Sequence, residues 1–132
     1  MTTTILLDAD LEGEAKYLKA GLEETGWYQD LTIEFKRLRD FGLSHDTPDQ
    51  EVWRFVQQHR LWLITNNRNN ESEIALQATI ERENTADSLP VITTSDKDKL
   101  AEPEYRRKAV TRLVEILIYP EQSLGTGRLY IP

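Results

Sequence analysis

Apolar residues along this chain fall into short runs and into stripes at helical spacing, and the two patterns alternate. The runs at residues 3–7, 31–35, 61–64 and 89–93 have the length and composition of strands. The segments between them carry apolar side chains three or four residues apart, which predicts helices with one buried face. The residues expected to form these faces are Leu11, Ala15, Leu18 and Leu22, then Val52, Phe55 and Val56, then Ile74, Ala75, Ala78 and Ile80, and finally Val110, Leu113, Val114 and Leu117.

Glycine and proline residues mark where these elements begin and end. Gly26 is expected to stop the first helix. Pro48 is expected in the first turn of the second helix, with Asp46 or Thr47 at its entrance, and Pro103 is expected to open the last helix. The tail at residues 125–132 predicts a short edge strand. This alternation predicts an α/β fold: a single three-layer domain over residues 1–132, with a doubly wound, mainly parallel sheet of about four or five strands.

Composition excludes several kinds of chemistry. The 132 residues include no cysteine and two histidines, so thiolate chemistry and a histidine-rich metal site are excluded. The net charge of −7 argues against binding nucleic acid through bulk electrostatics, although Lys36, Arg37 and Arg39 form one local basic group. Arg106, Arg107, Lys108 and Arg112 form a second such group. No apolar run is long enough to span a membrane, and we expect a cytoplasmic protein.

Polar residues follow the predicted strands and indicate a ligand-binding site there. Asp8 and Asp10 follow the first strand, and Thr65 and Asn66 end the third. In doubly wound sheets, ligands bind outside the carboxyl ends of the strands. The start of the second helix brings Asp49 toward the same edge. Oxygen ligands of this kind suit Mg²⁺ or Mn²⁺, which would make phosphodiester hydrolysis the natural chemistry.

Structural roles compete with this interpretation. Asp10 is also expected as a cap for the helix at Leu11, and Asp49 as a favourable charge at a helix start. His45 either serves as an acid or base near the crevice or is simply an exposed loop residue. The tryptophans Trp27, Trp53 and Trp62 either stack on bases or belong to the core or an interface, with Trp62 favoured as core.

Two other classes fit poorly. The segment at residues 125–127 lacks the strand-to-helix context of a phosphate-binding loop. A response-regulator receiver domain needs an aspartate at the end of its third strand, where this chain has Thr65 and Asn66.

Three blocks of sequence resemble the PIN-like domains of unknown function that are related to toxin-type ribonucleases. The blocks are Ile5-Leu6-Leu7-Asp8-Ala9-Asp10-Leu11, then Gly42-Leu43 with Thr47-Pro48-Asp49-Gln50-Glu51-Val52, and then Leu63-Ile64-Thr65-Asn66-Asn67-Arg68-Asn69. Their order and spacing match the family over about the first half of the chain. The resemblance implies a metal-dependent ribonuclease using Mg²⁺ or Mn²⁺, with RNA as its substrate.

The residues and the resemblance together suggest roles in such a site. Asp8, Asp10 and Asp49 would be metal ligands, with Asp8, Asp49 and Asn67 catalytic. Arg68 and Asn69 would contact substrate, although pairing of Arg68 with Glu71 is equally consistent.

This chain also departs from the family pattern. Ala9 and Asp10 replace Glu and Asn, and Asn67 and Asn69 stand where the family has aspartates. Fewer carboxylates weaken metal binding unless Asp10, Glu71 or Glu73 compensates. The alternative is therefore a non-catalytic PIN-like interaction module that forms a homo-oligomer or binds a protein partner.

Overall fold

The computed structural model describes residues 2–66 and 71–132, which form an α/β domain. Its elements in chain order are β1 (Thr3–Leu7), η1 (Ala9–Glu14), α1 (Ala15–Thr25), α2 (Trp27–Asp30), β2 (Ile33–Arg37), η2 (Leu38–Phe41), α3 (Asp49–His59), β3 (Trp62–Asn66), α4 (Glu71–Glu83), β4 (Val91–Thr94), η3 (Lys97–Ala101), α5 (Pro103–Ile118), η4 (Pro120–Gln122) and β5 (Arg128–Ile131), where η denotes a 3-10 helix.

The strands form one five-stranded sheet in the order β2-β1-β3-β4-β5, and all four neighbouring pairs are parallel. This order also occurs in flavodoxin-like folds. The chain first crosses from β1 to β2 on one side and later adds β3 on the other side of β1. The direction in which successive strands are added therefore reverses between β1 and β3. This position is the topological switch point.

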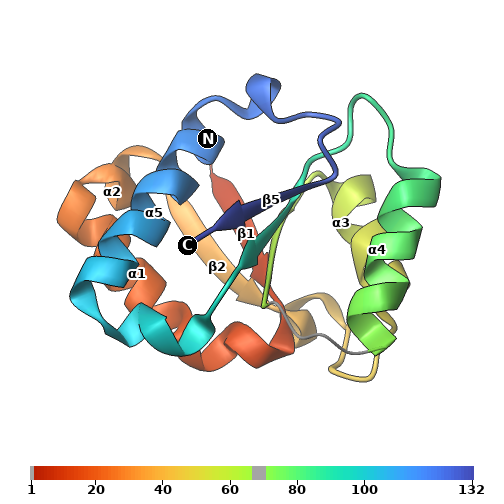
Figure 1. Cartoon of the computed structure of the whole chain (residues 1–132), viewed down its shortest axis with the longest axis horizontal. Coiled ribbons are helices and arrows are strands. Elements are labelled where there is room, and N and C mark those ends of the chain that lie inside the picture. The colour runs from red at the N-terminus through yellow and green to blue at the C-terminus, as the bar shows by residue number, and fades with distance from the viewer. Residues whose placement is uncertain (1, 67–70) are drawn as a thin grey trace.

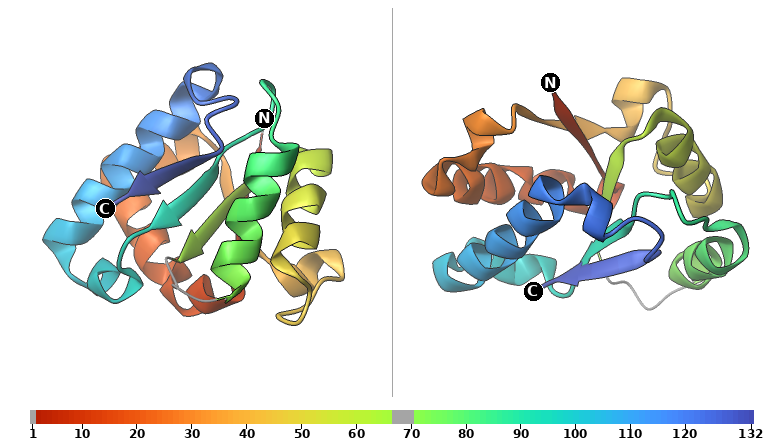
Figure 2. Two further views of the ribbon diagram at one scale, coloured as in Figure 1. Left: turned by 45° about the vertical axis from the view of Figure 1, so that its right-hand side comes forward. Right: turned by 90° about the horizontal axis from the view of Figure 1, so that it is seen from above.

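Helices cover both faces of the sheet (Figure 1). Helices α1, α2 and α5 lie on one side and α3 and α4 on the other, and the view from above separates the three layers (Figure 2). Alternate strand residues face opposite layers, because successive side chains of a strand point to opposite faces. Ile5 and Leu7 of β1 pack in the core beside α1 and α5, whereas Leu6 packs in the core beside α3 and α4.

Most of the predicted elements are confirmed, and the fold class is the predicted one. β1 has the predicted bounds, Pro103 is the first residue of α5, and the tail forms the edge strand β5. Gly26 ends α1 in the left-handed conformation, with φ of 82°. The second strand was predicted two residues too early, because Leu31 is still the C-cap of the short helix α2.

The predicted inner face of α4 is confirmed at Ile80 and wrong at Ile74 and Ala78. Ile74 is 70% exposed and Ala78 is exposed, whereas Leu76, Thr79 and Ile80 are buried. The helix is therefore rotated relative to the prediction. On this rotated face, Glu73 lies against Arg128 of β5, and the two charged side chains are only 12% and 7% exposed.

Candidate functional site

Asp8 lies at the topological switch point. Its backbone N–H donates to the carbonyl oxygen of Ile64 at 3.0 Å, which extends the β1–β3 ladder by one residue. Its carboxylate Oδ1 accepts from the backbone N–H of Ala9 at 2.9 Å, so that Asp8 is the N-cap of η1. The half-buried carboxylate is therefore held in place at the carboxyl end of a central strand.

The structure corrects the expected capping role of Asp10. Asp8 caps the turn after β1, and Asp10 lies inside η1 as an exposed residue. The backbone carbonyl of Asp10 accepts from Nζ of Lys97 at 2.9 Å. Because Lys97 belongs to η3, this bond joins the turn after β1 to the turn after β4.

Asp49 is the first residue of α3 and is half-buried. Pro48 is the N-cap of this helix rather than a residue of its first turn, and no side chain caps the helix start. A carboxylate in this first turn interacts favourably with the positive end of the helix dipole. The carboxyl ends of the strands and the start of α3 face the same edge of the molecule, which is the lower edge in Figure 1.

Mg²⁺ is typically held by one or two protein carboxylates together with water and substrate phosphate. Residues 2–66 and 71–132 contain no group of three or more acidic or histidine side chains positioned to hold a metal ion. A closed cage of protein carboxylates is therefore not built from the described part of the chain. Asp8 follows β1, Asp10 lies in η1 and Asp49 begins α3, so the three predicted ligands come from three successive parts of the fold.

Three of the predicted site residues, Asn67, Arg68 and Asn69, lie outside the described residues. The predicted compensating acid Glu73 is engaged elsewhere, because its Oε1 accepts from Nη1 of Arg128.

The threonines at the strand ends are part of the core. Thr65 and Thr93 share a hydrogen bond of 2.9 Å between their hydroxyl groups, and both side chains are buried. The hydroxyl of Thr94 donates to the carbonyl of Pro132. Asn66, at the end of β3, is half-buried.

Basic residues lie on elements to both sides of β1, the strand that ends at Asp8. The group of Lys36, Arg37 and Arg39 lies at the carboxyl end of β2, and Lys97 and Lys99 lie in η3 after β4. The sequence identified the first group but gave no reason to place it beside Asp8. The sheet order supplies that reason. β2 lies on one side of β1, and β3 and then β4 lie on its other side.

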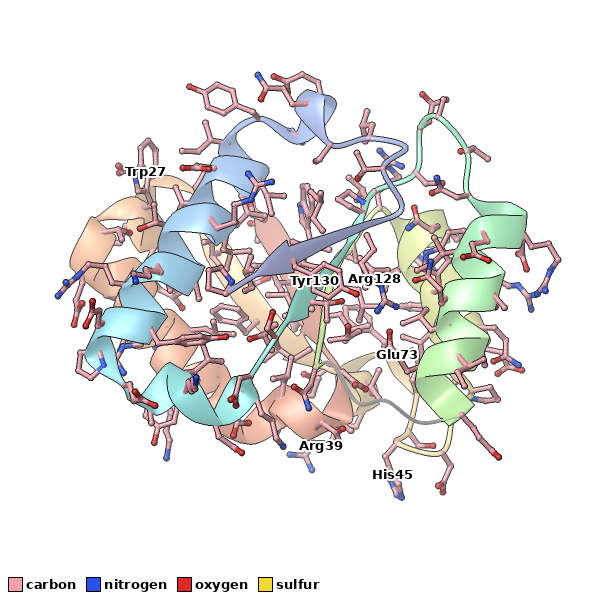
Figure 3. The ribbon with its side chains drawn as sticks, viewed as in Figure 1. Trp27, Arg39, His45, Glu73, Arg128 and Tyr130 are labelled. Atoms are coloured by element: carbon pink, nitrogen blue, oxygen red, sulfur yellow. The ribbon has the colours of Figure 1, made fainter. Side chains whose placement is uncertain are left out.

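A hollow of about 210 Å³ opens beside this basic flank. Its lining residues include Ala9, Glu12, Leu38, Arg39 and His45. Arg39 and His45 lie at the lower edge of the molecule (Figure 3). The His45 side chain is 77% exposed and its Nε2 lies 3.3 Å from Oδ1 of Asp46, so it is the exposed loop histidine that the sequence allowed.

Asp40 stabilises the turn that carries this basic flank. The backbone N–H of Arg37 donates to Oδ2 of Asp40 at 2.8 Å. This hydrogen bond, with the nearby guanidinium of Arg37, lowers the pKa of Asp40 below its usual value. Asp40 therefore stays ionised at neutral pH and offsets part of the positive charge around it.

The tryptophans offer no stacking surface at this edge. Trp53 and Trp62 are buried, which confirms Trp62 as a core residue. Trp27 is 38% exposed but lies on α2, at the upper left of Figure 3 and away from the strands' carboxyl ends.

Comparisons with known proteins add no relative to this picture. No protein-family model, no curated protein and no solved structure matches the chain. None of the helices in the described residues is both long and apolar enough to cross a membrane.

Proposed function

We propose that this protein is a PIN-like domain that binds Mg²⁺ or Mn²⁺ at the carboxyl edge of its sheet and hydrolyses RNA there. The observation that carries the proposal is the position of Asp8: a half-buried carboxylate at the switch point, where doubly wound sheets bind their ligands. A cation bound there would polarise a phosphodiester and activate water for in-line attack.

Asp8 is the principal metal ligand in this proposal, because its backbone is fixed by Ile64 and its carboxylate by the N–H of Ala9. Such fixing reduces the reorganisation that metal binding requires. Asp10 and Asp49 contribute directly or through water, and Asn67 orients a water or a phosphate. Arg68 and Asn69 contact the substrate.

The basic flanks support a polyanionic substrate. Each phosphate contact requires a nearby cation, and the net charge of −7 means that these cations must be local. Arg39 on one side of Asp8 and Lys97 on the other provide such local charge. A single strand of RNA lying along the carboxyl edge would pass both.

The test is titration calorimetry with Mn²⁺ on the wild type, on Asp8→Asn and on the control Asp30→Asn. Asp30 is an exposed acid on α2, so this control makes the same chemical change away from the proposed site. We expect saturable Mn²⁺ binding by the wild type and the control, and its loss in Asp8→Asn.

Hydrolysis of a labelled single-stranded RNA should follow the same order: activity in the wild type and in Asp30→Asn, and background rates in Asp8→Asn. Absence of Mn²⁺ uptake at millimolar concentration would refute the metal-dependent proposal. It would leave the non-catalytic interaction module that the sequence also allows.

A further inference from the structure

β5 is one of the two edge strands of the described sheet, and β2 is the other. β5 pairs with β4 alone, and no described element lies beyond it in the view from above (Figure 2). The backbone carbonyls of Gly127 and Ile131 accept from Val91 and Ser95 on the β4 side. Because backbone groups alternate in direction along a strand, those of Arg128 and Tyr130 point away from β4. The backbone N–H and C=O groups of these two residues are therefore available to pair with a further strand.

Two hollows flank this edge, one on each face of the sheet. The hollow beside α4 measures about 510 Å³ and is lined by Gln77, Ile80, Glu81, Arg128 and Tyr130 among others. The hollow beside α5 measures about 120 Å³ and has Leu129 in its lining. A strand added to β5 would send alternate side chains into the two hollows.

We propose that this edge binds a second copy of the same chain, with the two β5 strands antiparallel across a two-fold axis. This proposal does not depend on the proposed ribonuclease activity. It follows from the self-complementarity of the edge, which a two-fold interface requires.

The free backbone groups fix the register. Arg128 pairs with Tyr130 of the second copy, and Tyr130 with its Arg128, which makes two hydrogen-bonded pairs and four hydrogen bonds. Leu129 then lies opposite itself. The ladder ends beyond this segment, because Pro132 has no N–H to donate.

The side chains suit the same register. Tyr130 is 53% exposed although it is aromatic, and it would lie directly opposite Arg128 of the second copy. Directly opposed side chains on one face of an antiparallel pair lie close together, so Tyr130 would cover the Arg128–Glu73 pair of the second copy, which stays intact. Leu129 would meet its own counterpart on the α5 face, where it packs at the margin of the core.

Charge supports a second copy as the occupant. The α4 hollow has Glu81 and Arg128 in its lining, and the α5 hollow has Arg112 and Glu115. Arg112 pairs with Glu115, and Arg128 pairs with Glu73, so these linings together with Glu73 carry a net charge of −1, whereas the whole chain carries −7. Two negatively charged chains would thus approach through a surface that carries little of their net charge.

The absence of cysteine in the chain permits a direct test of the register. In Leu129→Cys, the two thiols would sit in a non-hydrogen-bonded antiparallel pair, with Cα atoms about 4.5 Å apart, which a disulfide can bridge. In the matched variant Tyr130→Cys the two cysteines would be diagonal neighbours. Their Cα atoms would lie about 7–8 Å apart, beyond the usual Cα separation for a disulfide. Tyr130 is more exposed than Leu129. Crosslinking by random collision between chains would therefore be faster for Tyr130→Cys than for Leu129→Cys.

We expect mild oxidation to convert most of Leu129→Cys, and little of Tyr130→Cys, to a covalent dimer on a non-reducing gel. Crosslinking of Tyr130→Cys as fast as Leu129→Cys would overturn the register. Failure of both to crosslink, together with a monomer at every concentration in sedimentation equilibrium, would overturn the second copy and leave the edge to an extended segment of another protein.

A proline variant tests the backbone pairing independently. Tyr130→Pro removes one outward N–H and no hydrogen bond to β4, and proline is tolerated on an edge strand. We expect a loss of dimer by sedimentation equilibrium with an unchanged circular dichroism spectrum. A folded Tyr130→Pro variant that dimerises like the wild type would refute pairing through this edge.

Discussion

Thr65 and Thr93 occupy paired positions on β3 and β4, and their hydroxyl groups hydrogen-bond to each other at 2.9 Å. Thr65 is 3% exposed and Thr93 is fully buried. Each hydroxyl is thus the other's partner in a region from which water is excluded. The pair therefore belongs to the core between β3 and β4.

Replacing one of these threonines with valine should lower stability by about 1–3 kcal/mol, because the remaining hydroxyl keeps its desolvation cost without its partner. The double variant Thr65→Val/Thr93→Val should lose less than the sum of the two single variants. Urea unfolding of the four proteins measures this coupling as a double-mutant cycle. Additive losses would show that the two hydroxyls do not depend on each other.

Gly21 and Gly13 should respond to alanine in opposite directions. A Cβ on Gly21 would lie 2.7 Å from Cγ2 of Val110 and 3.1 Å from Cγ of Arg106, so that α1 and α5 would have to separate. We expect Gly21→Ala to cost about 1–3 kcal/mol, as overpacking of a core does.

Gly13 has no atom within 4 Å of its added Cβ. Gly13→Ala should therefore stabilise the protein by about 0.4–1 kcal/mol, since it reduces the freedom of the unfolded chain. Thermal unfolding of both variants checks the pair. A stabilised Gly21→Ala would mean that the helices can move apart at little cost.

Local sequence signals were sufficient for most of the fold. The apolar run at β1, the glycine after α1 and the proline that opens α5 each act on nearby residues, so their effects can be read from the chain. The alternation of strands and helices then restricts the fold to a parallel, doubly wound sheet. It also located Asp8 at the carboxyl end of a strand.

Long-range contacts explain what the sequence did not predict. The inner side of α4 carries Glu73, which meets Arg128, 55 residues away along the chain. An apolar pattern that included Ile74 could not reveal that a charged pair would face the sheet edge. The basic flank of the candidate site was missed for the same reason, because only the sheet order brings Arg39 and Lys97 to either side of Asp8.

Gln57 should be the most sensitive polar residue of α3. Its Nε2 donates to the carbonyl of Leu89 at 2.7 Å, and its Oε1 accepts from the N–H of Leu89 at 3.0 Å. The side chain thereby satisfies both backbone groups of a buried residue just before β4. We expect Gln57→Ala to lower stability by about 1–3 kcal/mol, because both groups lose their partner.

The neighbouring Gln58→Ala is the matched control, since Gln58 is exposed. It should change stability by less than about 0.5 kcal/mol. Denaturant unfolding distinguishes the two variants, and equal effects would argue against the double hydrogen bond.

Glu83 and Arg54 should make the contact between α3 and α4 dependent on pH. Arg54 donates from Nε at 2.9 Å and from Nη2 at 2.6 Å to the carboxylate of Glu83. These hydrogen bonds lower the pKa of Glu83 below its usual value. Folding therefore favours the ionised form, so the pair stabilises the folded state fully above the unfolded-state pKa of about 4.3 and loses this effect as pH falls through the lowered pKa.

The difference in unfolding free energy between the wild type and Glu83→Gln should thus be larger at about pH 6 than at about pH 3. It should also shrink at high salt at pH 6, because the pair is partly exposed and ions screen it. Glu121→Gln, an exposed acid on η4, provides the control and should show no comparable dependence. A difference for Glu83→Gln that is constant between the two pH values would mean that ionisation of Glu83 contributes nothing to this contact.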